Sequence, residues 1–162
     1  MIWYVLEPLV TWAYNTSISA WIRASQWAVA ILEVFHLFGL IFLLGSVCMI
    51  ALRAFGLVMQ RDPVDRVVRN LAPATIGGLV LMTITGALIF SSGATRYIDS
   101  RSFQVKMVFY VLAITAQFAT YVMALRKKDS GRRLSPLWMV MGGLALLLWF
   151  GVGIAGRAIA FI

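Results

Sequence analysis

The sequence contains a single cysteine, Cys48, and a single histidine, His36, among 162 residues. A lone cysteine cannot form an intrachain disulfide. Without a Cys-x-x-Cys or Cys-x-x-Cys-His motif, the chain also lacks the means to attach a c-type haem covalently or to build a cysteine zinc site. The motif His-Glu-x-x-His, a phosphate-binding loop and a nucleophile triad are absent as well. Hydrolytic and nucleotide-dependent chemistry is therefore unsupported.

Acidic residues are scarce too: six Asp and Glu stand against fourteen Lys and Arg, so the formal charge is +8 at pH 7. In a soluble protein this excess would suggest nucleic acid as a partner. Here, however, 62% of the residues are hydrophobic, whereas a soluble domain is nearer half apolar. The basic residues lie in short segments between apolar runs, where membrane orientation and anionic lipid explain them better. No motif that reads RNA or DNA is visible, so we expect a lipid bilayer as partner and no nucleic acid.

Four apolar segments are each long enough to cross a bilayer, which takes about 20 residues. We predict spans at about 26–52, 74–91, 103–125 and 136–159. The chain length leaves room for one membrane domain, residues 1–162, and for no second one. The predicted fold is therefore an all-α integral membrane protein with a bundle of four transmembrane helices.

Two shorter helices are predicted outside the spans. Tryptophan and tyrosine concentrate before the first span, and these residues favour the headgroup level of a membrane. They predict an interfacial helix over Ile2–Tyr14, then a polar turn at 15–17 and a lead-in to the first span. Asp62-Pro63 is typical of a helix start and predicts a short amphipathic helix, about 63–70, along the membrane surface. The second span would then begin separately after Pro73.

The distribution of positive charge predicts the orientation. Four spans place the segments 53–73 and 126–135 on the same side of the membrane. The positive-inside rule assigns this more basic side to the cytoplasm. Both termini would then face the periplasm of a bacterial inner membrane. The nine basic residues on the inner side are Arg53, Arg61, Arg66, Arg69, Arg126, Lys127, Lys128, Arg132 and Arg133, against Arg23, Arg96, Arg101, Lys106 and Arg157 on the outer side.

Glu33 and His36 are ionisable residues inside the first span, and their i, i+3 spacing places them on one helix face. An ionisable residue inside a membrane is costly and is by default a functional-site hypothesis. At a rise of 1.5 Å per residue, His36 lies about 14 Å from Trp27, in the outer half of the bilayer. Lys106 and Arg157 lie toward the outer ends of the third and fourth spans. We predict that Glu33 forms an ion pair with one of them, which would reduce the cost of burial.

These four residues predict a haem site. A neutral imidazole in a helix bundle is the usual axial ligand of a b-type haem, and Arg and Lys suit the haem propionates. We therefore predict haem b with His36 as metal ligand and with Glu33, Lys106 and Arg157 as further cofactor-binding residues. The protein would act as a cytochrome-like electron carrier or haem sensor, as a homo-oligomer with a redox partner protein. The second axial ligand stays open between Met82, Met107, Met123 or Met141, His36 of another copy, and none.

Two other interpretations of His36 remain. Copper or another metal could be held by His36, Glu33 and a methionine. Alternatively, His36 is a packing residue that Glu33 holds by a hydrogen bond one turn away. The protein would then be a cofactor-free accessory or assembly subunit, or a small metal or solute transport component. Transport needs a continuous polar path, and the inner halves of the spans offer little beyond Thr75.

Several short motifs suggest a family. The first span has Glu-x-x-His at 33–36, the third has Phe-x-x-Lys at 103–106, and the fourth ends in Gly-Arg at 156–157. Together with Leu71-Ala72-Pro73 and Thr85-Gly86, these motifs resemble a family of small four-span bacterial inner-membrane proteins. That family is distantly similar to copper-resistance-D-type membrane proteins. The resemblance covers most of the chain and implies the four-span fold, but it implies no settled activity. This chain departs from the family pattern at Ala51, where the family has an acidic residue.

Overall fold

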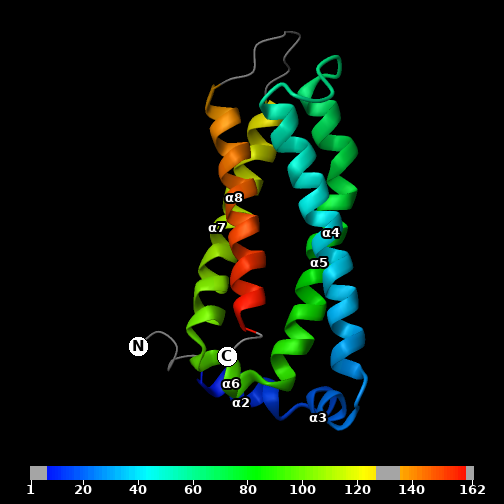
Figure 1. Ribbon diagram of the computed structural model, residues 1–162, viewed down its shortest axis with the longest axis vertical. Coiled ribbons are helices and arrows are strands. Elements are labelled where there is room, and N and C mark those ends of the chain that lie inside the picture. The colour runs from blue at the N-terminus through cyan, green and yellow to red at the C-terminus, as the bar shows by residue number, and fades with distance from the viewer. Residues whose placement is uncertain (1–6, 127–135, 160–162) are drawn as a thin grey trace.

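Four long helices form the body of the molecule. The computed structural model describes residues 7–126 and 136–159, and these fold as helices without any strand. The long helices run up and down as a bundle (Figure 1), and each is long and apolar enough to cross a membrane. The prediction of an all-α membrane bundle is therefore confirmed. These helices are α4 (Ala28–Ala54), α5 (Val64–Ser92), α7 (Arg101–Arg126) and α8 (Pro136–Ala158).

Three short helices lie across one end of the bundle (Figure 1): α2 (Glu7–Tyr14), α3 (Ser17–Ala24) and α6 (Ala94–Asp99). We call this end the capped end, and the opposite end, where α4 leads into α5, the loop end. The described part of the predicted helix Ile2–Tyr14 is α2, while residues 2–6 lie outside the described range. The predicted lead-in to the first span is a helix of its own, α3, because the Thr16 side chain caps it by accepting a hydrogen bond from the Ser19 amide at 3.2 Å.

The long helices pack as two pairs that contact each other on two sides. α4 packs along α5 and α7 packs along α8, while α4 also contacts α8 and α5 also contacts α7. α4 and α7 therefore lie on diagonal corners of the bundle. Two clusters of buried side chains fill its middle and its loop end. The central cluster is Leu43, Val47, Met82, Ala113, Trp149 and Val152, and the second is Ile50, Ala54, Val68, Ala124 and Trp138.

Polar side chains inside the bundle are tied to one another across helices. The Tyr121 hydroxyl on α7 donates to the Thr75 hydroxyl on α5 at 2.8 Å. The oxygens of Thr75 and Ser46 on α4 are also 2.8 Å apart, and Ser46 donates to the Leu43 carbonyl at 2.9 Å. This chain of hydroxyls links three helices toward the loop end and leaves none of these hydroxyls unsatisfied, as burial in an apolar environment requires.

The predicted break between a surface helix and the second span is absent. A surface helix over about 63–70 and a separate span from 74 were predicted, but α5 is continuous from Val64 to Ser92 with Pro73 inside it. This prediction was wrong. A helix of 29 residues is about 44 Å long, which exceeds the roughly 30 Å hydrocarbon core. Its charged first turns can therefore extend beyond the core without lying flat, and prolines are tolerated within membrane helices.

The boundaries of the other elements lie closer to the predicted ones. The other three spans match the predicted ranges to within two residues at each end. The segment 92–102 was expected to be a loop, but most of it forms α6. Most of the basic segment 126–135 lies outside the described residues.

Candidate functional site

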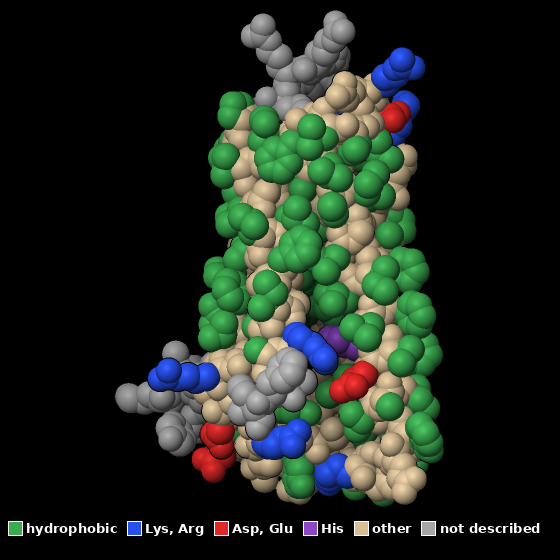
Figure 2. Space-filling view, viewed as in Figure 1, with side chains coloured by type: hydrophobic (Ala, Val, Ile, Leu, Met, Phe, Trp, Pro, Cys, Tyr) green, Lys and Arg blue, Asp and Glu red, His purple; other side chains and the backbone are tan. Residues whose placement is uncertain are grey.

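A cavity of about 560 Å³ opens near the capped end. Ligand-binding pockets commonly enclose about 300–1,000 Å³. In Figure 2 the histidine is visible in a hollow on the side of the bundle, between basic and acidic side chains and beside the apolar band. The cavity thus brings together three of the four predicted site residues. Its lining is Glu33 and His36 from α4, Gly86, Ile89 and Phe90 from α5, Arg96, Tyr97 and Asp99 from α6, Ser100, Phe103 and Lys106 from α7 and its start, and Gly156 and Ile159 from the end of α8.

His36 is oriented by a hydrogen bond to the neighbouring helix. Its Nδ1 lies 3.1 Å from the Thr85 hydroxyl oxygen, and that oxygen lies 2.7 Å from the Leu81 carbonyl oxygen. Because a carbonyl can only accept, Thr85 donates its single proton to Leu81 and accepts from Nδ1–H of His36. A neutral His36 therefore carries its proton on Nδ1 and keeps a lone pair on Nε2, for which the described structure contains no hydrogen-bond donor.

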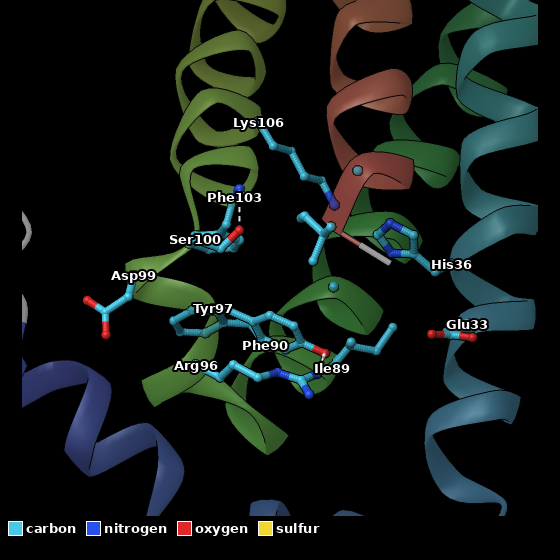
Figure 3. A pocket seen from close by; sticks show the side chains of 13 residues that line it. Glu33, His36, Ile89, Phe90, Arg96, Tyr97, Asp99, Ser100, Phe103 and Lys106 are labelled. Carbon is cyan, nitrogen blue, oxygen red and sulfur yellow. Dashed lines mark hydrogen bonds between the residues drawn. The ribbon is translucent and has the colours of Figure 1, made fainter. Parts of the chain in front are cut away.

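Glycines lie beneath the two nitrogen-bearing side chains that enter the cavity. A Cβ at Gly86 would lie 3.1 Å from Cε1 and 3.4 Å from Nδ1 of His36. A Cβ at Gly156 would lie 3.4 Å from both Cε and Nζ of Lys106. Each side chain thus lies against the backbone of a neighbouring helix, and in Figure 3 Lys106 extends from α7 toward the His36 ring. The sequence marked Gly86 only as part of the Thr85-Gly86 motif, because this contact depends on the register between two helices.

Three aromatic rings form the wall of the cavity toward the capped end. Phe90 and Phe103 are stacked with their centroids 5.0 Å apart and their planes at 13°. The Tyr97 ring lies 6.4 Å from each of them, and the Arg96 guanidinium lies over Tyr97 at 5.2 Å. A Cβ at Gly93 would come within 2.9 Å of the Tyr97 ring, so a glycine lets this ring pack close to the chain. The sequence did not predict this wall, because Tyr97 comes from α6, which was expected to be loop.

The predicted ion pair of Glu33 is not formed. In the part of the chain that the structure describes, Glu33 has no basic partner within 4.0 Å, and the side chain that holds His36 is Thr85 rather than Glu33. The reason lies in the bundle: Glu33 is on α4 and Lys106 is on α7, which occupy diagonal corners with the cavity between them. In Figure 3 both side chains border this cavity from different sides. Glu33 is exposed at the cavity mouth.

Other predicted ligands lie away from the cavity. Arg157 follows the lining residue Gly156, but it is exposed and is not among the residues that line the cavity. Among the described residues no methionine lines it either, and Met82 belongs to the central apolar cluster. Within residues 7–126 and 136–159, no three His, Cys, Asp or Glu side chains gather as a metal site would require. A copper site on His36, Glu33 and a methionine therefore lacks its sulfur ligand.

No protein-family model, curated protein or solved structure matches this chain. The family resemblance drawn from the motifs at 33–36, 103–106 and 156–157 thus stays a prediction.

Proposed function

We propose that this protein is a small membrane-bound b-type haem protein, with the cofactor in the cavity and Nε2 of His36 as an axial ligand. The observation that carries the proposal is the orientation of His36. Histidines that bind metals typically donate their other ring N–H to a fixed acceptor, which holds the ring and selects the tautomer. Thr85 is such an acceptor at Nδ1. A b-type haem supplies one-electron chemistry, so the role would be electron transfer or haem and redox sensing.

The other lining residues suit a flat amphipathic group with carboxylates. The stacked rings of Phe90, Tyr97 and Phe103 offer an apolar surface to a macrocycle. Arg96 at the capped end offers a guanidinium, which binds carboxylates such as haem propionates by charge-assisted hydrogen bonds. Glycines at 86 and 156 let His36 and Lys106 lie directly against the backbone of two helices.

For the orientation, we propose that the capped end faces the periplasm of a bacterial inner membrane. The described basic residues at the loop end include Arg53, Arg61, Arg66, Arg69 and Arg126, and basic segments are retained in the cytoplasm. The cavity would then lie in the outer half of the bilayer, where a periplasmic redox partner could exchange electrons with it.

A cofactor-free accessory or assembly subunit is the competing proposal. The hydrogen bond between His36 and Thr85 would equally satisfy a packing histidine, and this observation favours the competitor. A transport role has less support. The central cluster around Leu43, Val47 and Trp149 is fully buried, and it fills the bundle between the cavity and the loop end.

Absorption spectroscopy distinguishes these proposals. We expect the protein, expressed with ample haem precursor and purified in detergent, to show a Soret band and to bind haemin in an equimolar amount. His36→Ala should lose the band, whereas Phe38→Ala should keep it, because Phe38 lies on the same helix but is half-exposed on its outer surface. A folded wild-type protein that stays colourless and takes up no haemin would reject the haem proposal and favour the cofactor-free role.

A further inference from the structure

We infer that Lys106 is the second axial ligand, on the opposite side of the cofactor from His36. This inference rests on the proposed haem function. The sequence left the second ligand open between four methionines, another copy's His36 and none, and it assigned Lys106 to the propionates. The arrangement of the cavity favours a different role for this lysine.

His36 comes from α4 and Lys106 comes from α7, and these helices occupy diagonal corners of the bundle. Figure 3 shows the two side chains extending toward one another from opposite walls. A flat group that occupies the cavity would therefore have a nitrogen of His36 on one side and the amine of Lys106 on the other.

Few side chains of the cavity lining could coordinate haem iron. Thioether, thiolate, imidazole and phenolate groups are the common protein ligands of haem iron, and among the described residues the cavity lining contains only His36 and Tyr97 of these. The Tyr97 hydroxyl accepts a hydrogen bond from Arg96 at 3.4 Å, and its ring is stacked in the aromatic wall. The guanidinium of Arg96 keeps its proton in proteins and offers no lone pair. A deprotonated lysine amine does have a lone pair, so Lys106 is the remaining nitrogen donor in this cavity.

The described residues offer Lys106 no polar partner. In the described structure its ammonium forms no hydrogen bond and no ion pair within 4.0 Å, and its Nζ lies against the backbone at Gly156. Holding an ammonium without a hydrogen-bond or ion-pair partner in a half-buried position is costly. On binding, Lys106 would release one proton to water at the cavity mouth, and its lone pair would form the nitrogen–iron bond. The iron keeps its oxidation state, so the step needs no other reactant.

The spin state of the ferric protein tests this inference, because two strong nitrogen ligands make the iron low-spin. We expect a low-spin absorption and electron paramagnetic resonance spectrum for the wild type. Lys106→Ala and Lys106→Arg should both become high-spin while still binding haem. The arginine variant is decisive, because it keeps the positive charge that a propionate needs but cannot coordinate iron. A low-spin spectrum in Lys106→Arg, or a high-spin spectrum in the wild type, would overturn the inference and leave the haem proposal intact.

Gly156→Ala tests the same inference if the Lys106 variants do not fold. Its Cβ would lie 3.4 Å from Nζ of Lys106, so it should shift the amine and raise the high-spin fraction. Gly153→Ala on the same helix is the matched control, since a Cβ there meets nothing within 4 Å. Equal spectra for the two glycine variants would count against Lys106 as ligand. A wild type that binds no haem at all would instead refute the proposed function.

Discussion

The Thr85 hydroxyl determines which nitrogen of His36 is available. It donates to the Leu81 carbonyl one turn earlier at 2.7 Å, a back-bond that serine and threonine often form in membrane helices. Because its only proton is donated to Leu81, the oxygen can only accept from His36, so the imidazole is held as the Nδ1–H tautomer. One threonine on α5 thus prepares Nε2 on α4 as a lone-pair donor.

Thr85→Val should therefore weaken haem binding while the fold persists. Valine has nearly the same volume but no acceptor, so Nδ1–H is left unsatisfied and the ring loses its fixed orientation. Losing such a partner commonly costs about 10–100-fold in affinity, and a haemin titration measures it. Thr115→Val is the control, because Thr115 forms the same kind of back-bond, to Val111 at 2.8 Å, but is exposed. Equal affinities in the two variants would show that Thr85 does not prepare the site.

Single residues of this site were predictable to different degrees. Glu33 and His36 could be identified from the sequence, because ionisable residues in an apolar run are costly and their spacing places them on one face. Both do line the same cavity. The contacts of His36 with Thr85 and Gly86 could not be predicted, since they depend on how α4 and α5 are aligned. The predicted ion pair of Glu33 with Lys106 or Arg157 was wrong. For Lys106 the reason is related, because spacing along the chain does not reveal which helices lie on diagonal corners.

At the scale of whole helices, the site depends on a close crossing of α4 and α5. A Cβ at Gly39 would lie 2.8 Å from the Met82 amide nitrogen and 2.9 Å from the Gly78 carbonyl oxygen. A Cβ at Gly78 would lie 2.7 Å from both the Gly39 carbonyl oxygen and the Leu43 amide nitrogen. Small residues permit such backbone contact between membrane helices. The crossing is one turn from His36 on α4, so it sets the distance at which His36 meets Thr85.

Gly39→Ala should separate these two helices and destabilise the protein. The obstructing atoms belong to the backbone of α5, which cannot move aside as a side chain could. Overpacking of this kind costs about 1–3 kcal/mol, measurable by unfolding in mixed detergents with circular dichroism. Gly45→Ala is the matched control on the same helix, because a Cβ there meets nothing within 4 Å. A Gly39→Ala protein as stable as this control would contradict a backbone-to-backbone crossing.

The helices themselves could be predicted where the length of an apolar run determines their bounds, as in α4, α7 and α8. They were not predictable where charge and proline suggested a break. The charged residues at 65–70 and Pro73 indicated a surface helix followed by the start of a new helix. Instead α5 continues through them, because the part of a helix that extends beyond the hydrocarbon core can carry charged residues. Helix α6 was missed because six residues are too few to show a periodic pattern.

At the scale of the whole molecule, packing is uneven from end to end. The middle and the loop end are filled by two apolar clusters and by the hydroxyl chain of Ser46, Thr75 and Tyr121. The capped end contains the cavity, with short helices lying across its base (Figure 1). Any ligand therefore reaches His36 from this end or from the side of the bundle, and the side of the membrane that the capped end faces determines the partner.

The orientation is tested by labelling introduced cysteines from outside the cell. In a Cys48→Ser background, Asn15→Cys probes the capped end and Gln60→Cys probes the loop end, since both positions are exposed. We expect a membrane-impermeant maleimide to label Asn15→Cys in intact spheroplasts and Gln60→Cys only after permeabilisation. The physical reason is that moving one positive charge outward against the membrane potential costs about 2.3 kcal/mol per 100 mV, so the basic loop end stays inside. The opposite labelling pattern would place the His36 cavity on the cytoplasmic side, where its redox partner would have to be a cytosolic protein.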